Sequence, residues 1–409
     1  MQSSKPRLLV VACGFPQLGL LRFARDQGLV VVGVDANPQA VGVPLCDEFE
    51  QVSTRDTAGI VRAARAHRVD GLTTCGADHA LGSTAAAAER LGLPFYADPD
   101  TVQACQHKDL MRARYQDAGA PSPAHAAVSS LAEAKEFRTS RGLPLVVKPA
   151  RGWGQRGVSV IRYDQEFEPA VVRALEATRA AGHSACVLEQ FVEGREFSVN
   201  AYTQAGTTTV LAITERIITH YPDPPGITFA EAYPAELDAA GERQVMDAAV
   251  RGLNALGIRR GPTYTQVRYG EAGAFLVETA HRLGGGLDPD VTWLATGVSL
   301  YRKIVGVALD RRDWEACTRE GEAHPGAVGR FLVGTPGRVT DVQGLAQARG
   351  LPGVVGAEVY VSAGGTVHPL TDGSKRAGHV LAFGSSRADA EQNAARAMQT
   401  IRIVTEQPA

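Results

Sequence analysis

Short apolar runs alternate with amphipathic segments along the first hundred residues of the chain. The runs are continuous and rich in valine and leucine, as expected of strands buried on both faces of a parallel sheet. In the segments between them, apolar residues recur at helical spacing. The runs span 7–13, 29–35 and 69–75, and the amphipathic segments span 19–27, 58–67 and 80–92. This alternation predicts a doubly wound α/β sheet.

The pattern changes twice further along the chain. Near residue 120 a proline-broken connector precedes apolar runs that are typical of antiparallel pairs, as at 143–150 and 157–163. Near residue 330 a tail begins, with predicted strands at 357–361 and 379–383 and a closing helix at 386–402. We therefore predict three domains, which span residues 1–105, 106–330 and 331–409.

Composition narrows the function classes. The 409 residues are enough for two or three domains, and the formal charge of -2 gives no reason to expect a nucleic acid partner. Six cysteines lie far apart without zinc-site spacing, which is typical of reduced thiols. No apolar segment is long enough to span a bilayer, and the N-terminus lacks the layout of a signal peptide. We expect a soluble, cytoplasmic protein with no membrane partner.

The turn after the first predicted strand has part of the layout of a dinucleotide-binding fold. Gly14 and Gly19 follow the strand and Asp35 closes the next one, but the GxGxxG spacing is absent. The middle glycine that lets backbone approach a pyrophosphate is missing, which favours a Rossmann-like sheet without this cofactor. Asp78 and His79 follow the third strand, where they either contact a ligand or cap the next helix.

A lysine and a run of glycines occupy residues 143–161. Lys148 ends a predicted strand, and a positive charge at that place suits phosphate oxygens. Gly152, Gly154 and Gly157 let backbone N–H groups approach a polyphosphate, although no GK[ST] pair follows as in a Walker A loop. The alternative is a solvated hairpin.

Two acids mark the next candidate element. Residues 187–192 and 196–202 are predicted strands, and the segment between them could offer backbone C=O and N–H groups to the edge of an adenine. Glu189 and Glu196 would then accept hydrogen bonds from the amino-group side and from ribose hydroxyls. The alternative is a pair of surface acids beside a hairpin glycine.

A predicted hairpin within residues 261–286 carries candidate metal ligands. Its strands, 263–269 and 274–280, alternate so that Gln266 and Glu278 can face the same side. Two oxygen donors suit Mg²⁺, which keeps water and substrate phosphates as its other ligands.

Arg282 lies just beyond this hairpin. Its guanidinium would reach a phosphoryl group or an acyl phosphate, where charge develops during transfer. The glycines at 284–286 would keep that approach open to a substrate.

The order of these segments resembles that of ATP-grasp ligases, and the resemblance covers nearly the whole chain. It implies an ATP-grasp fold of the α/β class in three parts. These are a Rossmann-like pre-ATP-grasp domain at 1–105, an ATP-grasp domain at 106–330 and a small α+β domain at 331–409. Within the ATP-grasp domain, the ATP-binding lobe spans about 120–190 and the core about 191–330.

The resemblance also implies nucleotide contacts at the matching positions. Lys108, in the segment HKDLMRARYQDAGAPSP, and Lys148, beneath the glycine-rich loop, would contact nucleotide phosphates. The segment LEQFVEGREFSV matches the family's hinge. This match implies that Glu189, Gln190 and Val192 contact adenine and that Glu196 contacts ribose. ATP and Mg²⁺ are therefore the expected cofactors.

The end of the hairpin matches the family pattern E-x-N-x-R with one departure. The match implies that Glu278 holds Mg²⁺ and that Arg282 stabilises the acyl-phosphate step. Gln266 stands where the family usually has Glu, and Ala280 replaces the Asn, so Glu278 is the only anionic ligand. Either ATP mainly holds the second magnesium ion, or a neighbour such as His281 compensates.

The resemblance further implies a reaction. ATP phosphorylates a small carboxylate, and an amine or similar nucleophile attacks the acyl phosphate, which releases ADP and phosphate. The C-terminal sequence is most similar to the branch that joins amino acids or related small acids. Two alternatives stay open: delivery of the acyl group to a carrier-protein thiol, and an ATP-binding regulatory module that has lost ligation. Relatives commonly pair, so we expect a homodimer.

Residues 213–235 are predicted to form a long proline-rich connection, which in the family faces the same cleft. Arg216, His220 and Glu231 are therefore candidates for binding the substrate, with a solvated loop as the alternative for each. The other residues expected to face the substrate are Arg282, Gly284 and Gly285.

Overall fold

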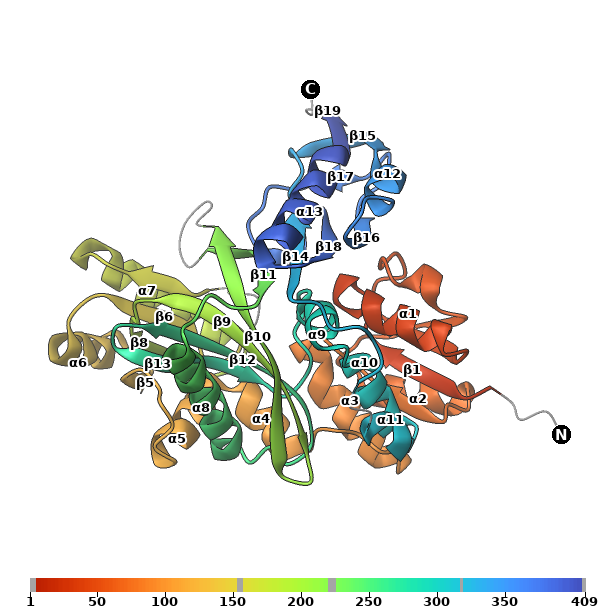
Figure 1. Cartoon of the computed structure of the whole chain (residues 1–409). Coiled ribbons are helices and arrows are strands. Elements are labelled where there is room, and N and C mark those ends of the chain that lie inside the picture. The colour runs from red at the N-terminus through yellow and green to blue at the C-terminus, as the bar shows by residue number, and fades with distance from the viewer. Residues whose placement is uncertain (1–4, 153–156, 220–225, 317–318, 407–409) are drawn as a thin grey trace.

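The computed structural model describes residues 5–152, 157–219, 226–316 and 319–406. Figure 1 shows an N-terminal α/β region in red and orange, a central region built on two sheets, and a C-terminal region in blue. Within the described residues, no helix is long and apolar enough to cross a membrane.

The N-terminal region is a four-stranded parallel sheet with its helices. The elements are β1 (Arg7–Val11), η1 (Phe15–Gln17), α1 (Leu18–Asp26), β2 (Val30–Asp35), η2 (Val43–Leu45), β3 (Glu48–Gln51), α2 (Thr57–Ala66), β4 (Gly71–Thr73), α3 (Asp78–Leu91) and α4 (Pro99–Gln106). The strand order is β3-β2-β1-β4, with every pair parallel. The buried, valine-rich strands confirm the alternation predicted from the sequence.

A smaller antiparallel sheet follows, after a helix that leads into it. The elements are α5 (Lys108–Asp117), β5 (His125–Val128), α6 (Leu131–Arg141), β6 (Leu145–Pro149), β7 (Ser159–Ile161), α7 (Asp164–Ala180) and β8 (Cys186–Gln190). The order is β5-β8-β6-β7, and β6 pairs with β7 in antiparallel register as predicted. We call this sheet and its helices the lobe.

The largest sheet has eight strands and supports most of the chain's centre. Its strands are β9 (Arg195–Gln204), β10 (Thr207–Thr219), β11 (Ile227–Tyr233), β12 (Gly261–Gly270), β13 (Gly273–Ala280), β14 (Gly326–Leu332), β16 (Val354–Val359) and β18 (Gly378–Gly384). Their order is β13-β12-β9-β10-β11-β14-β18-β16. Because β16 and β18 join it, this sheet extends across the predicted domain boundary near residue 330.

Further helices and a small sheet complete the central and C-terminal regions. In the centre, α8 (Ala239–Ala255) packs on β12 and β13, and α9 (Asp288–Thr296) packs on β14. The C-terminal elements are β15 (Gly337–Gln343), α12 (Leu345–Arg349), β17 (Thr366–Val367), η3 (Gly373–Lys375), α13 (Arg387–Thr400) and β19 (Arg402–Glu406). The order β17-β15-β19 forms a three-stranded sheet.

The segment 213–235 corrects one sequence prediction. It is not mainly a connection, because β10 and β11 pair in antiparallel register through most of it. The ITERIIT stretch is rich in β-branched residues, which favour a strand, and the proline-rich residues that follow it concealed this signal. Arg216 and Glu231 are consequently cross-strand partners on adjacent strands.

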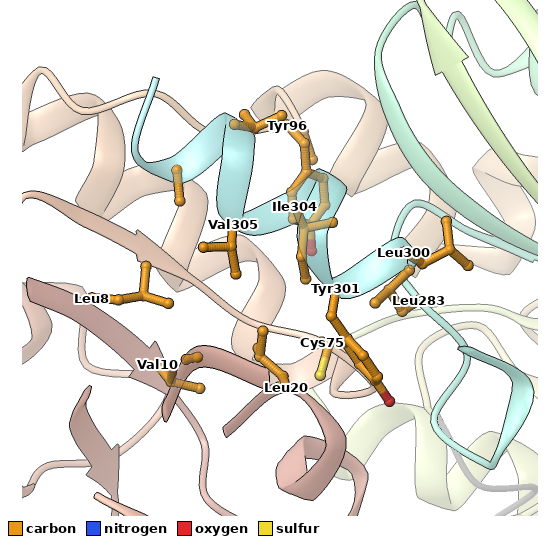
Figure 2. Close-up of a cluster of buried hydrophobic side chains, with 14 of the residues drawn as sticks. Leu8, Val10, Leu20, Cys75, Tyr96, Leu283, Leu300, Tyr301, Ile304 and Val305 are labelled. Carbon is orange, nitrogen blue, oxygen red and sulfur yellow. The ribbon is translucent and has the colours of Figure 1, made fainter. Parts of the chain in front are cut away.

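The N-terminal region is packed firmly on the central chain. The helices α10 (Leu300–Ala308) and α11 (Arg312–Ala316) contribute to a buried cluster in which Ile304 and Val305 join Leu8 and Val10 of β1 (Figure 2). Burying each such side chain contributes about 1.5–3 kcal/mol. This packing holds the loops after β1 and β4 in place beside the cavity described next.

Candidate active site

One cavity of about 540 Å³ lies where the regions meet, a size usual for small-molecule sites. Its walls come from the lobe, from β12 and β13, from the loops after β1 and β4, and from a loop of the C-terminal region. The predicted site residues that line it are Lys108, Lys148, Glu189, Gln190, Val192, Glu196, Arg216, Glu231, Gln266, Glu278, Arg282 and Gly285.

Two lysines lie at one end of the cavity. The Nζ of Lys148, in β6, donates to Glu189 Oε2 at 2.7 Å, and Glu189 Oε1 accepts from Arg112 Nε at 2.7 Å. Burial lowers the pKa of Lys148, and the charge of Glu189 opposes that shift. The Nζ of Lys108, in the first turn of α5, donates to the Gly152 carbonyl at 2.8 Å. Both ammonium groups are thus held where they can bind phosphate oxygens.

The Glu189 carboxylate belongs to this ion-pair network, not to the adenine hinge. Burial raises the pKa of the Glu189 carboxyl, but Arg112 and Lys148 lower it by more. The pKa therefore falls below its usual value, to about 2. An adenine contact at Glu189 would therefore come from its backbone. Arg112 also donates to two carbonyl groups of β13, so it joins the lobe to the large sheet. Sequence analysis missed Arg112, although its spacing of four residues from Lys108 on one helix was a usable signal.

The hinge between β8 and β9 forms another wall. Gln190 and Val192 line the cavity here, and the Val192 carbonyl accepts from Arg268 Nη1 at 2.9 Å. Glu196 accepts from Arg268 Nε at 2.9 Å and lies 3.3 Å from Arg216 Nε. Two arginines therefore fix the carboxylate beside the hinge, with lone pairs left for hydroxyl donors.

Gln266 and Glu278 lie directly opposite each other in the β12–β13 ladder, so their side chains share one face as predicted. Glu278 Oε1 lies 3.4 Å from Lys108 Nζ, and Gln266 Nε2 donates to the Tyr264 hydroxyl at 3.2 Å. The amide oxygen of Gln266 stays available as an acceptor. Across the described residues, no group of three His, Cys, Asp or Glu side chains could hold a metal. The donor set fits Mg²⁺ that takes its other ligands from phosphates and water.

The surroundings of His281 decide between the two ways of compensating for Ala280. His281 Nδ1 lies 2.8 Å from Thr101 Oγ1, and its Nε2 lies 2.7 Å from the Arg260 carbonyl. Burial lowers the pKa of His281 to about 4, so the ring is neutral. Both ring nitrogens are engaged and the side chain does not line the cavity. His281 is therefore not placed to replace the missing Asn.

Arg282 forms a bidentate pair with Asp78 at the start of α3. Nε donates to Oδ1 at 2.7 Å and Nη2 donates to Oδ2 at 2.5 Å. Burial raises the pKa of Asp78, but the charge and hydrogen bonds of Arg282 lower it below its usual value. Asp78 and His79 both line the cavity. Asp78 thus begins a helix and also orients the guanidinium, which sequence analysis had not foreseen.

The glycines after Arg282 serve close packing beside the cavity. A Cβ on Gly76 would lie 3.1 Å from Gly285 Cα, and the φ of +63° at Gly76 also favours glycine. A Cβ on Gly284 would lie 2.4 Å from the Asp288 carboxylate. Two loops from distant parts of the sequence can therefore approach each other only because they lack side chains.

Two of the predicted site residues do not line this cavity, and two others lie outside the described residues. Gly157, with a φ of +74°, and Gly284 are described but do not line it. Gly154 and His220 lie outside the described residues.

Another part of the cavity wall holds Arg216 and two buried acids. Arg216 Nη1 lies 3.4 Å from Glu231 Oε1, and Nη2 donates to Thr228 Oγ1 at 2.5 Å. Burial and the charge of Asp288 raise the pKa of Glu231 to about 8, despite the opposing charge of Arg216. Asp288 Oδ1 is buried with no hydrogen-bond partner in the described part of the chain. Two buried acids that disfavour each other's ionisation suit an amine or ammonium group.

We expect ionisation of Glu231 to lower the stability of the protein as pH rises from about 5 to about 8. Because its pKa is raised in the folded state, the folded chain binds more protons than the unfolded chain in this range. The free energy of unfolding therefore falls with rising pH. Glu231→Gln removes this titration, so the Tm of the variant relative to the wild type should increase with pH. A Tm difference that stays constant across this range would contradict the assignment.

Two family models match the chain. Residues 141–290 match the ATP-grasp domain, and residues 330–406 match the L-amino acid ligase C-terminal domain 2. The first range contains the lobe's Lys148, the hinge and the hairpin with Glu278 and Arg282.

Curated relatives match over part of their length. The uncharacterised protein y4rH of Sinorhizobium fredii is 30% identical over 307 residues, which cover 74% of this chain and 62% of that protein. A D-alanine–D-alanine ligase of Pseudomonas putida is 28% identical over 181 residues, which cover 43% of this chain and 55% of that enzyme.

Solved structures match over nearly the whole chain. The L-amino acid ligase of Bacillus licheniformis has a TM-score of 0.79 at 21% identity, covering 99% of this chain and 100% of that chain. A biotin carboxylase–β-γ-ATP complex from Campylobacter jejuni has a TM-score of 0.80 at 17% identity, covering 98% of this chain and 92% of that chain. These likenesses show a shared fold, as predicted. The family models show an ATP-grasp domain within residues 141–290 and a C-terminal domain of the L-amino acid ligase type within residues 330–406.

Proposed function

We propose that this protein is an ATP-dependent ligase that activates a small carboxylate as an acyl phosphate and joins it to an amine. The observation that carries the proposal is one cavity whose wall brings together two lysines, Glu278, Arg282 and a buried acid pair. The matches to an L-amino acid ligase domain and to a D-alanine–D-alanine ligase support it.

The proposed reaction has two steps. A carboxylate oxygen of the substrate bonds to the terminal phosphorus of ATP, and the bond from that phosphorus to the bridging oxygen breaks, which releases ADP. The amine then attacks the carbonyl carbon, phosphate leaves, and the amine loses a proton. The match to the ATP-grasp domain makes this route the expected one, and it demands positioning and charge stabilisation from the protein.

The cavity residues divide these tasks. Lys108 and Lys148 would hold phosphate oxygens, and Arg282 would stabilise the charge that develops on the transferred phosphoryl group. Glu278 and Gln266 would hold Mg²⁺, which neutralises phosphate charge when bound. We propose that Arg216 and Glu231, which also line the cavity, contact the substrates.

The first test is release of ADP and phosphate from Mg²⁺-ATP in the presence of pooled amino acids and small carboxylates. We expect at least one pool to stimulate ADP release by the wild type and none to stimulate the Arg282→Ala variant. Release of AMP and pyrophosphate would contradict the mechanism, because it would show adenylation. ATP binding without stimulation by any pool would contradict ligation of free small molecules and favour a carrier-protein acceptor or a regulatory role.

A further inference from the structure

A loop of the C-terminal region reaches the cavity. The loop between β17 and β18 contributes Asp372, Gly373, Ser374 and Arg376 to the cavity wall. The Arg376 guanidinium lies 3.6 Å from the centre of the Phe331 ring, and its Nη2 donates to the Thr228 carbonyl at 2.5 Å. Stacking on the ring and this hydrogen bond fix the guanidinium in one orientation.

Arg376 differs from the other arginines of this cavity. Arg216 and Arg282 each lie within ion-pair distance of a carboxylate, whereas Arg376 forms no ion pair with any described residue. Its Nε is buried and has no hydrogen-bond partner in the described structure. Burial and the nearby charge of Arg216 lower the pKa of Arg376 to about 10, so it still carries its charge near neutral pH.

A buried cation without an anion beside it is unfavourable for folding. An unpaired buried cation is typical of a binding site, where the ligand supplies the missing anion. The protein then retains function at the expense of stability. A planar guanidinium with a free Nε is suited to a carboxylate, which it can bind through two parallel hydrogen bonds.

The surroundings of Arg376 show which carboxylate this can be. The ionisable groups that influence its charge are Arg216, Glu231, Tyr360 and Asp288, and of these Arg216, Glu231 and Asp288 line the cavity. The carboxylate that reacts must instead meet the phosphoryl group near Lys108, Glu278 and Arg282. Building on the proposed ligase activity, we propose that Arg376 binds a substrate carboxylate that takes no part in the reaction. This carboxylate belongs either to an amino acid acceptor or to a donor with two carboxylates.

Turnover distinguishes these two sources. With substrates found by the ADP-release screen, each acceptor is compared with its carboxamide, and each dicarboxylic donor with its half-amide. We expect Arg376→Met to raise the KM of the free acid about a hundredfold, as loss of a bidentate charged pair implies. The KM for ATP, and the KM of the matching amide, should stay as in the wild type. Arg376→Lys should restore part of the loss.

The substrate whose free acid is sensitive to Arg376→Met, while its amide is not, is the source of the carboxylate. An equal rise in KM for acids and amides, or an equal fall in kcat for both, would overturn the proposal, because Arg376 would then only support the fold of the site.

Thermal unfolding tests Arg376 without turnover, so failure of this inference and failure of the proposed ligase activity can be told apart. We expect Arg376→Met to be at least as stable as the wild type in the absence of substrates, since it removes an unpaired buried charge. L-Alanine and L-glutamate, but not L-alaninamide, should raise the Tm of the wild type more than that of the variant. A lower Tm for Arg376→Met alone, or equal responses of both proteins to these acids, would overturn the inference even if ADP release is observed.

Discussion

Arg282→Ala is expected to lower kcat on the order of a thousandfold or more, since in the proposed mechanism the arginine stabilises charge that develops only during phosphoryl transfer. Its guanidinium is buried in the cavity wall and is already oriented by two hydrogen bonds to Asp78. The measurement is the rate of ADP release at saturating ATP and substrates. Arg282→Lys should recover only part of the rate, because an ammonium group lacks the planar pair of donors.

The ion pair requires a control for stability. Arg282→Ala leaves the Asp78 carboxylate largely buried without its partner, and removing one member of a buried pair costs about 3–5 kcal/mol, less where a side chain is 19% exposed as here. The double variant Arg282→Ala, Asp78→Ala removes both charges and should regain most of the Tm but none of the turnover. Recovery of turnover in the double variant would show that Arg282 serves the fold and not the reaction.

The N-terminal sheet and the hairpin were accessible from sequence because their signals are local. Continuous apolar runs predicted β1, β2 and β4, and period-two alternation predicted that Gln266 and Glu278 share a face. Strand ends followed by glycine likewise placed Lys148 beside the cavity. In each case the deciding interactions lie within one element or between adjacent strands.

The rest of the site depends on contacts between distant segments. Arg282 and Asp78 are 204 residues apart, and nothing near either residue indicates that they pair. The glycine contact between Gly76 and Gly285 has the same origin. Arg376 comes from a third region, which reaches the cavity because β18 continues the large sheet beyond the predicted boundary near residue 330. Periodicity gives no information on such packing, so these partners could not be predicted.

Glu278→Ala is expected to raise the Mg²⁺ concentration for half-maximal turnover about a hundredfold or more, since loss of even an outer-shell partner costs up to that factor. The reason is that Glu278 supplies the carboxylate of the proposed metal site, with Gln266 opposite it, Ala280 in place of the usual Asn, and both nitrogens of His281 engaged elsewhere. Titration of Mg²⁺ in the ADP-release assay measures this, and calorimetry of ATP binding with and without Mg²⁺ measures it independently of turnover.

The matched control for Glu278 is its cross-strand partner. Gln266→Glu places a second carboxylate on the same face and should lower the Mg²⁺ requirement, because an anionic oxygen binds Mg²⁺ more strongly than an amide oxygen. Neither change should alter the Tm strongly, since the Glu278 side chain is 30% exposed and its ion pair with Lys108 is long, at 3.4 Å. If Glu278→Ala left the Mg²⁺ dependence of both turnover and ATP binding unchanged, the metal would have to be held by other groups, and the β12–β13 hairpin would lose its proposed role.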